Sequence, residues 1–445
     1  MTPHRPAERK RGDGGRIALG LLGYNLGLLL ASPMLLAWLV WRLLIQRKGV
    51  GSWRQRLGFA PRPPAGARTR VWLHAVSAGE MTAMKPVLDA LRAARPEAYL
   101  ALSTVTETGM AVAERTCGAA DSRFYLPFDW GDCMALALWR VRPQLVVVAE
   151  KELWPNLLGL ASLLGMKTLV VNGRVSDRMM RRARRGGGFV RWLYRLPICL
   201  CVQSQLDAGR LAQLGVPAER VIVAGNTKAD GMAERDRALE ETLARELGVA
   251  KGEAWLVAGS THAGEEEAVV EAFAMIRARL PQARLLLAPR HLERVAEVSA
   301  MLASRGLAVV RRSEGAGPAE AIVVLDTMGE LRSAYAVGAA GFVGGTLVPR
   351  GGHNPLEPPA VGRAALFGPY TANCADVVEL AMQAGVGFRV QDPGDLADQF
   401  VRIAEDAALR ERVARDGPAL IESQRGAAQR CANLAVALLD EHSRE

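Results

Sequence analysis

Glutamates follow two apolar runs of this sequence, where a carboxylate could serve as a general base. The run Val71–Val76 precedes Ser77 and Glu80, and a later run is followed by Glu150 and Glu152. Ser77 and Glu80 have the spacing of a capping box, so Glu80 is either a helix cap or a base at the carboxyl end of a strand. A helix N-terminus favours the ionised carboxyl, which suits a base at neutral pH. The second pair also fits an ordinary polar turn between a strand and a helix.

A glycine-rich stretch in the second half could bind a phosphate. In Gly344–Glu357, glycines allow close backbone approach, and Asn354 could cap a helix whose first residue is Pro355. A helix N-terminus behind such a loop favours anions, although a glycine-rich turn without a ligand fits as well. The stretch is neither a P-loop nor Gly-x-Gly-x-x-Gly, which argues against an NTPase or a dehydrogenase.

Arginines are concentrated in one segment of the first half. Residues 172–195 hold eight arginines and a single acid, Asp177, and end in aromatic and aliphatic residues. This pattern predicts a basic amphipathic surface for anionic lipid headgroups, although a solvated charged helix fits too. The candidate residues for the acceptor and membrane surface are Arg181, Arg182, Arg184 and Arg185.

The N-terminal region contains an uncharged run, Ile17–Trp41, bounded by Arg16 and Arg42. About 20 apolar residues suffice to span a bilayer, so we expect a membrane anchor over about 17–41. The basic residues that follow it favour placing the rest of the chain in the cytoplasm. A buried core helix or a helix lying in one leaflet, with Pro33 inside it, is the alternative.

Composition narrows the classes of partner. The 445 residues carry a formal net charge of +10, which suits an anionic partner. No zinc knuckle or stacking-aromatic motif indicates nucleic acid. The six cysteines form no Cys-x-x-Cys, and the histidines are scattered, so we expect free thiols, no metal site and no cofactor.

Short apolar strands alternate with helices along the chain, and the alternation restarts after the polar stretch Asp230–Gly248. This order predicts an α/β protein with two doubly wound Rossmann-like domains facing across a cleft, plus the anchor helix. The expected division is a basic segment and anchor at 1–48, an acceptor domain at 49–229, a nucleotide-sugar domain at 230–425, and a helical tail at 426–445.

Several segments resemble one family when taken in order. They are HAVSAGE, EKELWPN, GNTKAD, AGSTHAGEEE, PRH, DTMGEL and FVGGTLVPRGGHNPLEP. Together with the anchor they resemble the Kdo transferases, which move an acidic eight-carbon sugar from CMP-Kdo to a lipid A precursor in Gram-negative bacteria. The resemblance implies a GT-B fold, metal-independent inverting transfer, and action at the cytoplasmic face of the inner membrane.

Site roles follow from the same resemblance. Glu80 matches the general base, and Glu150 and Lys228 match residues that stabilise the transition state. The matched CMP-binding positions are Pro289, Arg290, Met328, Gly329, Glu330, Asn354, Pro355, Leu356 and Glu357. Lys151, Thr227, Ala229 and Leu292 depart from the usual pattern, which bears on acceptor fit and not on the chemistry.

Two other functions remain open from the sequence. One is a GT-B transferase that uses a UDP-sugar and a polyprenyl-linked acceptor. The other is a non-catalytic, membrane-tethered anion binder. The expected partners are CMP-Kdo, a lipid A precursor and the phospholipid surface of the inner membrane.

Overall fold

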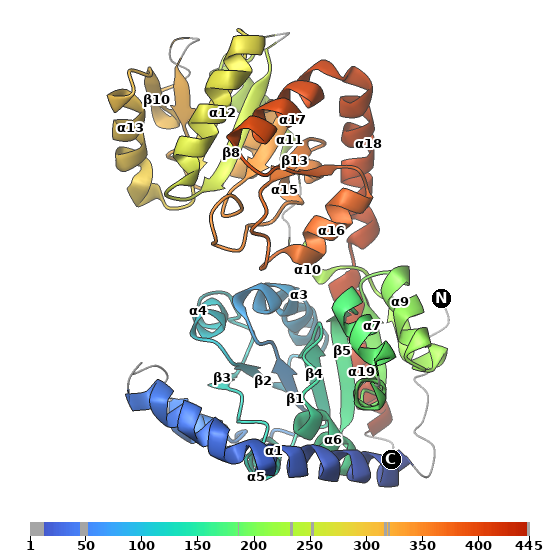
Figure 1. The fold of residues 1–445 in the computed structure, drawn as a ribbon. Coiled ribbons are helices and arrows are strands. Elements are labelled where there is room, and N and C mark those ends of the chain that lie inside the picture. The colour runs from blue at the N-terminus through green and yellow to red at the C-terminus, as the bar shows by residue number, and fades with distance from the viewer. Residues whose placement is uncertain are drawn as a thin grey trace. The chain divides into compact units, whose positions relative to one another are not determined.

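A computed structural model describes residues 13–44, 52–185, 187–231, 235–250, 253–315, 318 and 321–442. The chain divides into two compact units (Figure 1). The first unit is Met1–Gly231 together with Gln424–Glu445, and the second is Met232–Ser423. The parts of the expected basic segment at 1–12 and 45–48 lie outside the described residues.

A parallel sheet with strand order β3-β2-β1-β4-β5-β6-β7 forms the first unit. Its strands are Arg70–His74 (β1), Tyr99–Thr104 (β2), Ser122–Tyr125 (β3), Leu145–Ala149 (β4), Lys167–Gly173 (β5), Cys199–Val202 (β6) and Val221–Val223 (β7). Successive side chains alternate between the faces, so Val71 and Leu73 enter one core and Trp72 the other. Burial on both faces explains why these strands are apolar throughout.

Helices follow most strands of the first unit and cover both faces. They are Trp53–Arg56 (α2), Ala78–Ala94 (α3), Glu107–Thr116 (α4), Gly131–Val141 (α5), Pro155–Leu163 (α6), Asp177–Arg184 (α7), Gly188–Tyr194 (α8), Gln205–Gln213 (α9) and Thr227–Asp230 (α10). Ser77, Thr106 and Ser204 cap the helices that follow β1, β2 and β6. These caps fix each helix start just beyond a strand end.

The C-terminal helix α19, Ala427–His442, belongs to the first unit. Cys431, Ala432 and Leu438 are fully buried in the same core as α3. The carboxylate of Asp230 accepts hydrogen bonds from the backbone N–H groups of Gly426 and Ala428, both at 2.6 Å. The segment expected as a tail therefore completes the core of the first unit.

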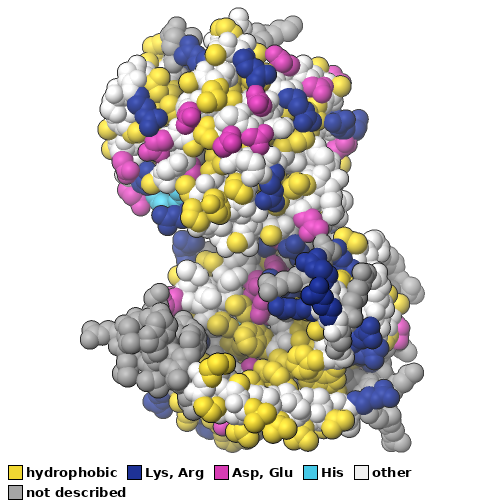
Figure 2. Space-filling model, in the orientation of Figure 1, with side chains coloured by type: hydrophobic (Ala, Val, Ile, Leu, Met, Phe, Trp, Pro, Cys, Tyr) yellow, Lys and Arg dark blue, Asp and Glu magenta, His cyan; other side chains and the backbone are white. Residues whose placement is uncertain are grey.

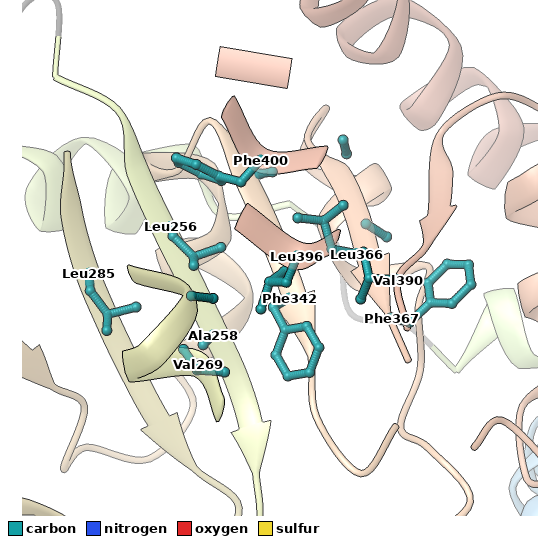
Figure 3. Packing of buried hydrophobic residues seen from close by; sticks show 14 of the residues in the cluster. Leu256, Ala258, Val269, Leu285, Phe342, Leu366, Phe367, Val390, Leu396 and Phe400 are labelled. Atoms are coloured by element: carbon teal, nitrogen blue, oxygen red, sulfur yellow. The ribbon is translucent and has the colours of Figure 1, made fainter. Parts of the chain in front are cut away.

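A second parallel sheet, of order β10-β11-β9-β8-β12-β13-β14, forms the second unit. Its strands are Trp255–Thr261 (β8), Arg284–Pro289 (β9), Val309–Arg311 (β10), Ile322–Val324 (β11), Ala340–Val343 (β12), Ala364–Phe367 (β13) and Gly387–Arg389 (β14). Its helices are Arg237–Glu246 (α11), Glu265–Arg279 (α12), Val295–Ser304 (α13), Leu331–Val337 (α14), Glu357–Ala360 (α15), Ala375–Gln383 (α16), Pro393–Glu405 (α17) and Ala407–Gln424 (α18). Leu256, Phe342 and Phe400 pack together on one face of this sheet (Figure 3).

Helix α1, Asp13–Leu44, lies along the first unit, against α6. Within the described residues, Gly14–Met34 is long and apolar enough to cross a membrane, with a mean hydropathy of 1.6. Only 11% of its most apolar stretch is buried in the protein. The structure thus contains an apolar helix at the expected position, and it makes contacts with the domain that follows it.

Three local features differ from the sequence expectations. The strands β3 and β14 were not anticipated, because edge strands have one neighbour and carry short, mixed patterns such as Gly387-Phe388-Arg389. The helix expected to start at Pro355 starts instead at Glu357 and is four residues long. Asn354 does not cap this helix, and its Oδ1 instead accepts from the backbone N–H of Leu356, ahead of the helix, at 3.1 Å.

Candidate active site

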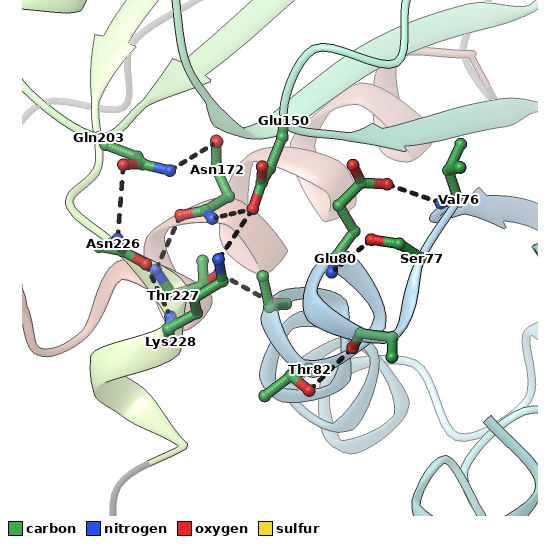
Figure 4. A network of polar contacts seen from close by, with 12 residues as sticks. Val76, Ser77, Glu80, Thr82, Glu150, Asn172, Gln203, Asn226, Thr227 and Lys228 are labelled. Atoms are coloured by element: carbon green, nitrogen blue, oxygen red, sulfur yellow. Dashed lines mark hydrogen bonds and ion pairs between the residues drawn. The ribbon is translucent and has the colours of Figure 1, made fainter. Parts of the chain in front are cut away.

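Glu80 lies in the first turn of α3, beyond the carboxyl end of β1. Its backbone N–H donates to Ser77 Oγ at 3.4 Å, and its own Oε2 accepts from the backbone N–H of Val76 at 2.7 Å. The side chain is buried, and these contacts hold the carboxyl over the end of the strand. Glu80 therefore closes the turn and also presents a carboxyl at the sheet edge (Figure 4).

The protonation of Glu80 is set by its surroundings and not by the helix terminus alone. Burial, then the neighbouring carboxylates of Glu152 and Glu150, raise the pKa of Glu80 to about 8. The hydrogen bond from Val76 lowers the pKa, but it does not offset the burial. The expectation that the helix N-terminus keeps this carboxyl ionised at neutral pH is wrong for that reason. Glu152 hydrogen-bonds with Glu80, and its own pKa is raised chiefly by burial.

Glu150 and Lys228 form a nearly buried ion pair beside Glu80. Glu150 Oε1 lies 3.2 Å from Lys228 Nζ, and both side chains are about one-tenth exposed. Asn172 Nδ2 donates to the same carboxylate at 3.4 Å. Glu150 has a φ of 53°, a left-handed conformation that non-glycine residues seldom adopt. Such strain persists only where surrounding contacts hold it, and it is common at functional sites.

Side-chain amides link neighbouring strand ends into one network (Figure 4). Asn172 Oδ1 accepts from the backbone N–H of Thr227 at 3.0 Å, and Gln203 Nε2 donates to the Asn172 carbonyl at 3.2 Å. Asn226 Oδ1 accepts from the Lys228 backbone N–H at 3.0 Å. These contacts fix the short helix α10 that carries Lys228. Sequence reasoning missed the amides, although each lies at or just beyond the carboxyl end of an apolar strand.

In the second unit, basic side chains gather near the ends of β8 and β9. The backbone N–H of Arg290 donates to the Thr261 carbonyl at 2.9 Å, while its side chain is exposed. His262 Nε2 lies 2.9 Å from His353 Nε2. Burial, and then the charge of Arg290, lower the pKa of His353 to about 4, so this histidine is neutral. The surface offers cationic and N–H donor groups suited to an anion.

Glu265 organises the glycine-rich loop. Its fully buried carboxylate accepts from the backbone N–H groups of Gly345 at 2.6 Å, Thr346 at 2.8 Å, Leu347 at 2.8 Å and His262 at 3.0 Å. Gly345 has a φ of 72°, which glycine adopts without strain. A carboxylate from α12 thus fills the anion-binding concavity of this loop. The sequence signal was the glutamate that opens α12, and it was not singled out.

The remaining candidate residues of the second unit border the same edge of the sheet. Met328 is 82% exposed and Gly329 has a φ of 85°, so both lie in a turn after β11. The Glu330 carboxylate accepts a hydrogen bond from the Thr327 hydroxyl, and its Oε2 lies 3.4 Å from Arg312 Nε. Burial raises the pKa of Glu357, and the charges of Arg332 and Arg290 oppose that rise. Pro289 ends β9, and Pro355 and Leu356 are buried below the loop.

The arginine-rich segment forms α7 and α8 of the first unit. Arg181, Arg182 and Arg185 are exposed, and the side chain of Arg184 lies outside the described residues. Met180 and Ala183 are buried on the opposite side of α7. The described part of the helix is therefore amphipathic, with its charges directed to solvent.

Metal-ligating groups do not cluster in the described part of the chain: it contains no group of three or more His, Cys, Asp or Glu arranged to hold a metal ion. All six cysteines are buried, and none forms a disulfide. The candidate site thus consists of carboxyls, amides and cations.

Two parallel-sheet α/β units in one chain define the GT-B fold. A solved UDP-GlcNAc 2-epimerase from Neisseria meningitidis, bound to UDP-GlcNAc, has this fold. It is 12% identical, with a TM-score of 0.51, and the match covers 84% of this chain and 100% of that chain. This likeness concerns the fold alone.

The family is identified by sequence comparison. Residues 51–231 match the family model described as 3-deoxy-D-manno-octulosonic-acid transferase (kdotransferase). A 3-deoxy-D-manno-octulosonic acid transferase of Bordetella pertussis is 33% identical over 431 residues, covering 92% of this chain and 96% of the relative. A 3-deoxy-D-manno-octulosonic acid transferase of Haemophilus influenzae is 30% identical, and the match covers 85% of this chain and 88% of that relative. The chain belongs to the Kdo transferase family, which confirms the resemblance noted in its motifs, and it is a glycosyltransferase.

Proposed function

We propose that this chain transfers Kdo from CMP-Kdo to a lipid A precursor, with inversion at the anomeric carbon, in lipopolysaccharide core biosynthesis. The observation that carries this proposal is the buried Glu80 carboxyl beside the Glu150–Lys228 ion pair. The sugar to be transferred is inferred from membership of the family. The groups proposed to carry out the transfer are the carboxyls and the ammonium of this site. We expect no metal to be required, because cationic side chains and N–H groups can neutralise the single phosphate of the leaving group.

Glu80 is proposed as the general base. In its ionised form, the carboxylate accepts the proton of an acceptor sugar hydroxyl, and that oxygen attacks the anomeric carbon of Kdo. The bond between this carbon and the phosphate oxygen of CMP breaks, and CMP leaves with the electron pair. A pKa near the working pH suits a base, because it balances the ionised fraction against proton affinity.

Lys228 and Glu150 are proposed to stabilise charge in the transition state. The ammonium of Lys228 pairs with Glu150, and the Asn226 amide fixes the backbone that carries it, so it needs little reorganisation when negative charge develops nearby. Kdo also carries a carboxylate, for which a fixed ammonium is a suitable partner. This assignment accounts for a strained residue, Glu150, at a strand end.

The second unit is proposed to bind the CMP moiety. Arg290, exposed at the end of β9, would contact the phosphate or the base, and Asn354 and Glu357 would border the nucleotide. CMP-Kdo has one phosphate between nucleoside and sugar, so cationic side chains and N–H groups can neutralise the leaving group without a divalent ion.

The first unit is proposed to meet the acceptor at the cytoplasmic face of the inner membrane. Its apolar helix α1 and the exposed Arg181, Arg182 and Arg185 suit a surface of phosphorylated and anionic lipids. No role for nucleic acid is proposed.

One assay tests the whole proposal. Purified full-length chain is incubated with CMP-Kdo generated in situ and a tetra-acylated lipid A precursor, and the product is analysed by mass spectrometry and NMR. Addition of Kdo with inverted anomeric configuration is expected. Parallel reactions contain UDP-GlcNAc with a polyprenyl-linked acceptor, and product there alone would refute the proposal. Absence of product in every reaction, from a protein that still binds lipid, would favour a non-catalytic anion binder.

A further inference from the structure

Helix α1 turns its more polar side toward the protein and most of its leucines away from it. Leu19, Leu22, Leu26, Leu29, Leu30 and Met34 are between 55% and 76% exposed. Their spacing places them on one face of the helix. Figure 2 shows hydrophobic side chains gathered along the part of the first unit that α1 forms in Figure 1. In water this arrangement would be unfavourable, because the apolar face is the one left exposed.

The inward side of α1 is bound to the first unit through polar groups. Asn25 and Asn156 exchange two hydrogen bonds, with Asn25 Nδ2 donating to Asn156 Oδ1 at 2.7 Å and Asn156 Nδ2 donating to Asn25 Oδ1 at 3.0 Å. Tyr24 hydrogen-bonds with Asp129, whose carboxylate also accepts from the backbone N–H groups of Asn156 and Leu157 at the start of α6. These partners are buried in the first unit. Separating α1 would leave them without their bonds.

Close packing accompanies these polar contacts. A Cβ on Gly20 would lie 2.3 Å from the Trp192 ring, and a Cβ on Gly159 would lie 2.7 Å from the Leu21 side chain. Tyr24 stacks on Phe189 of α8, with ring centroids 5.9 Å apart. Ile17 and Leu21 are buried in the core of the first unit. Shape and hydrogen bonding thus both fit α1 to this one surface.

A basic pocket lies at the C-terminal end of helix α5, the helix whose first residue lies beside α1. It has a volume of about 320 Å³ and is lined by Arg62, Arg70, Arg140, Arg142 and Trp139, with no acidic residue among its lining residues. The guanidinium groups of Arg62 and Arg142 lie 5.2 and 5.4 Å from the Trp139 ring. Helix α5 connects the two features, because a Cβ on its first residue, Gly131, would lie 3.3 Å from Asn25 Oδ1, and its last turn carries Trp139. Exposed tryptophan beside arginine is typical of a protein surface at the headgroup level of a bilayer.

From these contacts we infer that α1 is an in-plane membrane anchor. Its leucine face enters the cytoplasmic leaflet of an anionic phospholipid bilayer, its polar face stays bound to the first unit, and the helix does not cross the membrane. The arginines of the basic pocket bind the phosphates of neighbouring headgroups. A spanning helix of the same sequence would instead place Tyr24 and Asn25 in hydrocarbon without their partners. This inference concerns the position of the helix and does not depend on which sugar is transferred.

Topology labelling tests the inference. Gly14 is exposed at the start of α1, and a side chain there would meet no neighbouring atom, so Gly14→Cys introduces a reactive thiol without strain. The native cysteines are buried and give little background. The full-length variant is expressed in Gram-negative cells and treated with a membrane-impermeant maleimide. Ser304→Cys, exposed in the second unit, is the control for the cytoplasmic side.

An in-plane helix keeps Gly14→Cys on the cytoplasmic side. Labelling is therefore expected in inverted inner-membrane vesicles, at the level of Ser304→Cys, and not in intact spheroplasts. A spanning helix places the two thiols on opposite sides. Labelling of Gly14→Cys from the outside of spheroplasts, with Ser304→Cys protected, would overturn the inference.

A binding measurement tests the leucine face separately. The triple variant Leu22→Asp, Leu26→Asp and Leu29→Asp is compared with the parent chain for sedimentation with vesicles of equal parts phosphatidylglycerol and phosphatidylethanolamine. At least a tenfold loss of vesicle binding is expected. The thermal unfolding temperature should stay unchanged, because these three side chains are exposed and do not belong to the hydrophobic core. If the variant instead dissociates a dimer and still binds vesicles, the face is a contact between two copies and the inference is wrong.

Discussion

Glu150 Oε1 and Lys228 Nζ lie 3.2 Å apart, although 78 positions separate the two residues in the chain. The pair joins the end of β4 to the short helix α10 beyond β7, across the intervening strands. Asn172, at the end of β5, donates a hydrogen bond to the Glu150 carboxylate and accepts one from the backbone N–H of Thr227 in α10. The Glu80 carboxyl is near enough for the Glu150 charge to raise its pKa. This arrangement of carboxyls and one cation determines the behaviour expected of the variants below.

Glu80→Gln should abolish transfer while leaving the protein folded. Loss of a general base typically lowers the rate by about 10²–10⁴-fold. The matched control is Ser77→Ala, which removes the helix cap but keeps the carboxyl, and which should cost about 1 kcal/mol of stability with most of the activity retained. Initial rates and thermal unfolding of both variants are measured. Equal, modest loss of activity in the two would mean that Glu80 only stabilises the start of α3.

The pH dependence of transfer should follow the ionisation of Glu80. Its pKa is about 8, so the protonated form dominates at lower pH and kcat/KM should rise as pH increases through that value. Glu152→Gln removes the carboxylate that, after burial, contributes most to the raised pKa, so the profile should move to lower pH. A profile unmoved by Glu152→Gln would show that another group titrates.

The raised pKa of Glu80 also predicts a pH-dependent difference in stability between the parent chain and Glu80→Gln. A carboxyl whose folded pKa exceeds its ordinary value stabilises the fold when protonated, and this contribution is lost as pH rises from about 4.5 through about 8. Glutamine does not titrate, so Glu80→Gln should gain stability relative to the parent chain across this range. Urea unfolding at several pH values measures the difference, and a constant offset would contradict the assignment.

Lys228→Met should destabilise the first unit as well as abolish activity. It leaves the Glu150 carboxylate nearly buried without its cation, which typically costs about 3–5 kcal/mol. Adding Glu150→Gln removes the unpaired charge, so the double variant should recover stability but not transfer. Recovery of both stability and transfer in the double variant would mean that the ion pair has a structural role only. A double-mutant cycle on the free energies of unfolding measures the coupling energy between Glu150 and Lys228.

Donor binding should depend on the second unit. Arg290→Ala should weaken CMP binding through loss of a cation, and Glu357→Ala should weaken it through changes at the loop edge. Glu265→Gln should weaken it indirectly, because an amide cannot accept all four N–H groups that hold the glycine-rich loop. Glu271→Gln, exposed on the same helix α12, is the control. Calorimetry with CMP measures affinity, and unchanged values in all three variants would move the nucleotide site elsewhere.

The strand-end residues could be located from the sequence because parallel strands bring their carboxyl ends to one edge of a sheet. An apolar run followed by Glu80 or Glu150 was enough to place these glutamates at that edge, and the order of strands and helices was enough to predict two doubly wound units. The motifs also indicated the family, which the comparisons confirm. These features depend on local patterns, which one stretch of chain carries by itself.

Tertiary structure decided the properties that depend on neighbours distant in the chain. The direction of the Glu80 pKa shift follows from burial and from Glu152 and Glu150, which no capping motif reveals. The return of α19 to the first unit, like the orientation of α1, follows from contacts with residues more than a hundred positions away. An apolar helix has no intrinsic inner face, so its sequence predicted a membrane helix, while Asn156 and Asp129 decided which side of it the protein binds.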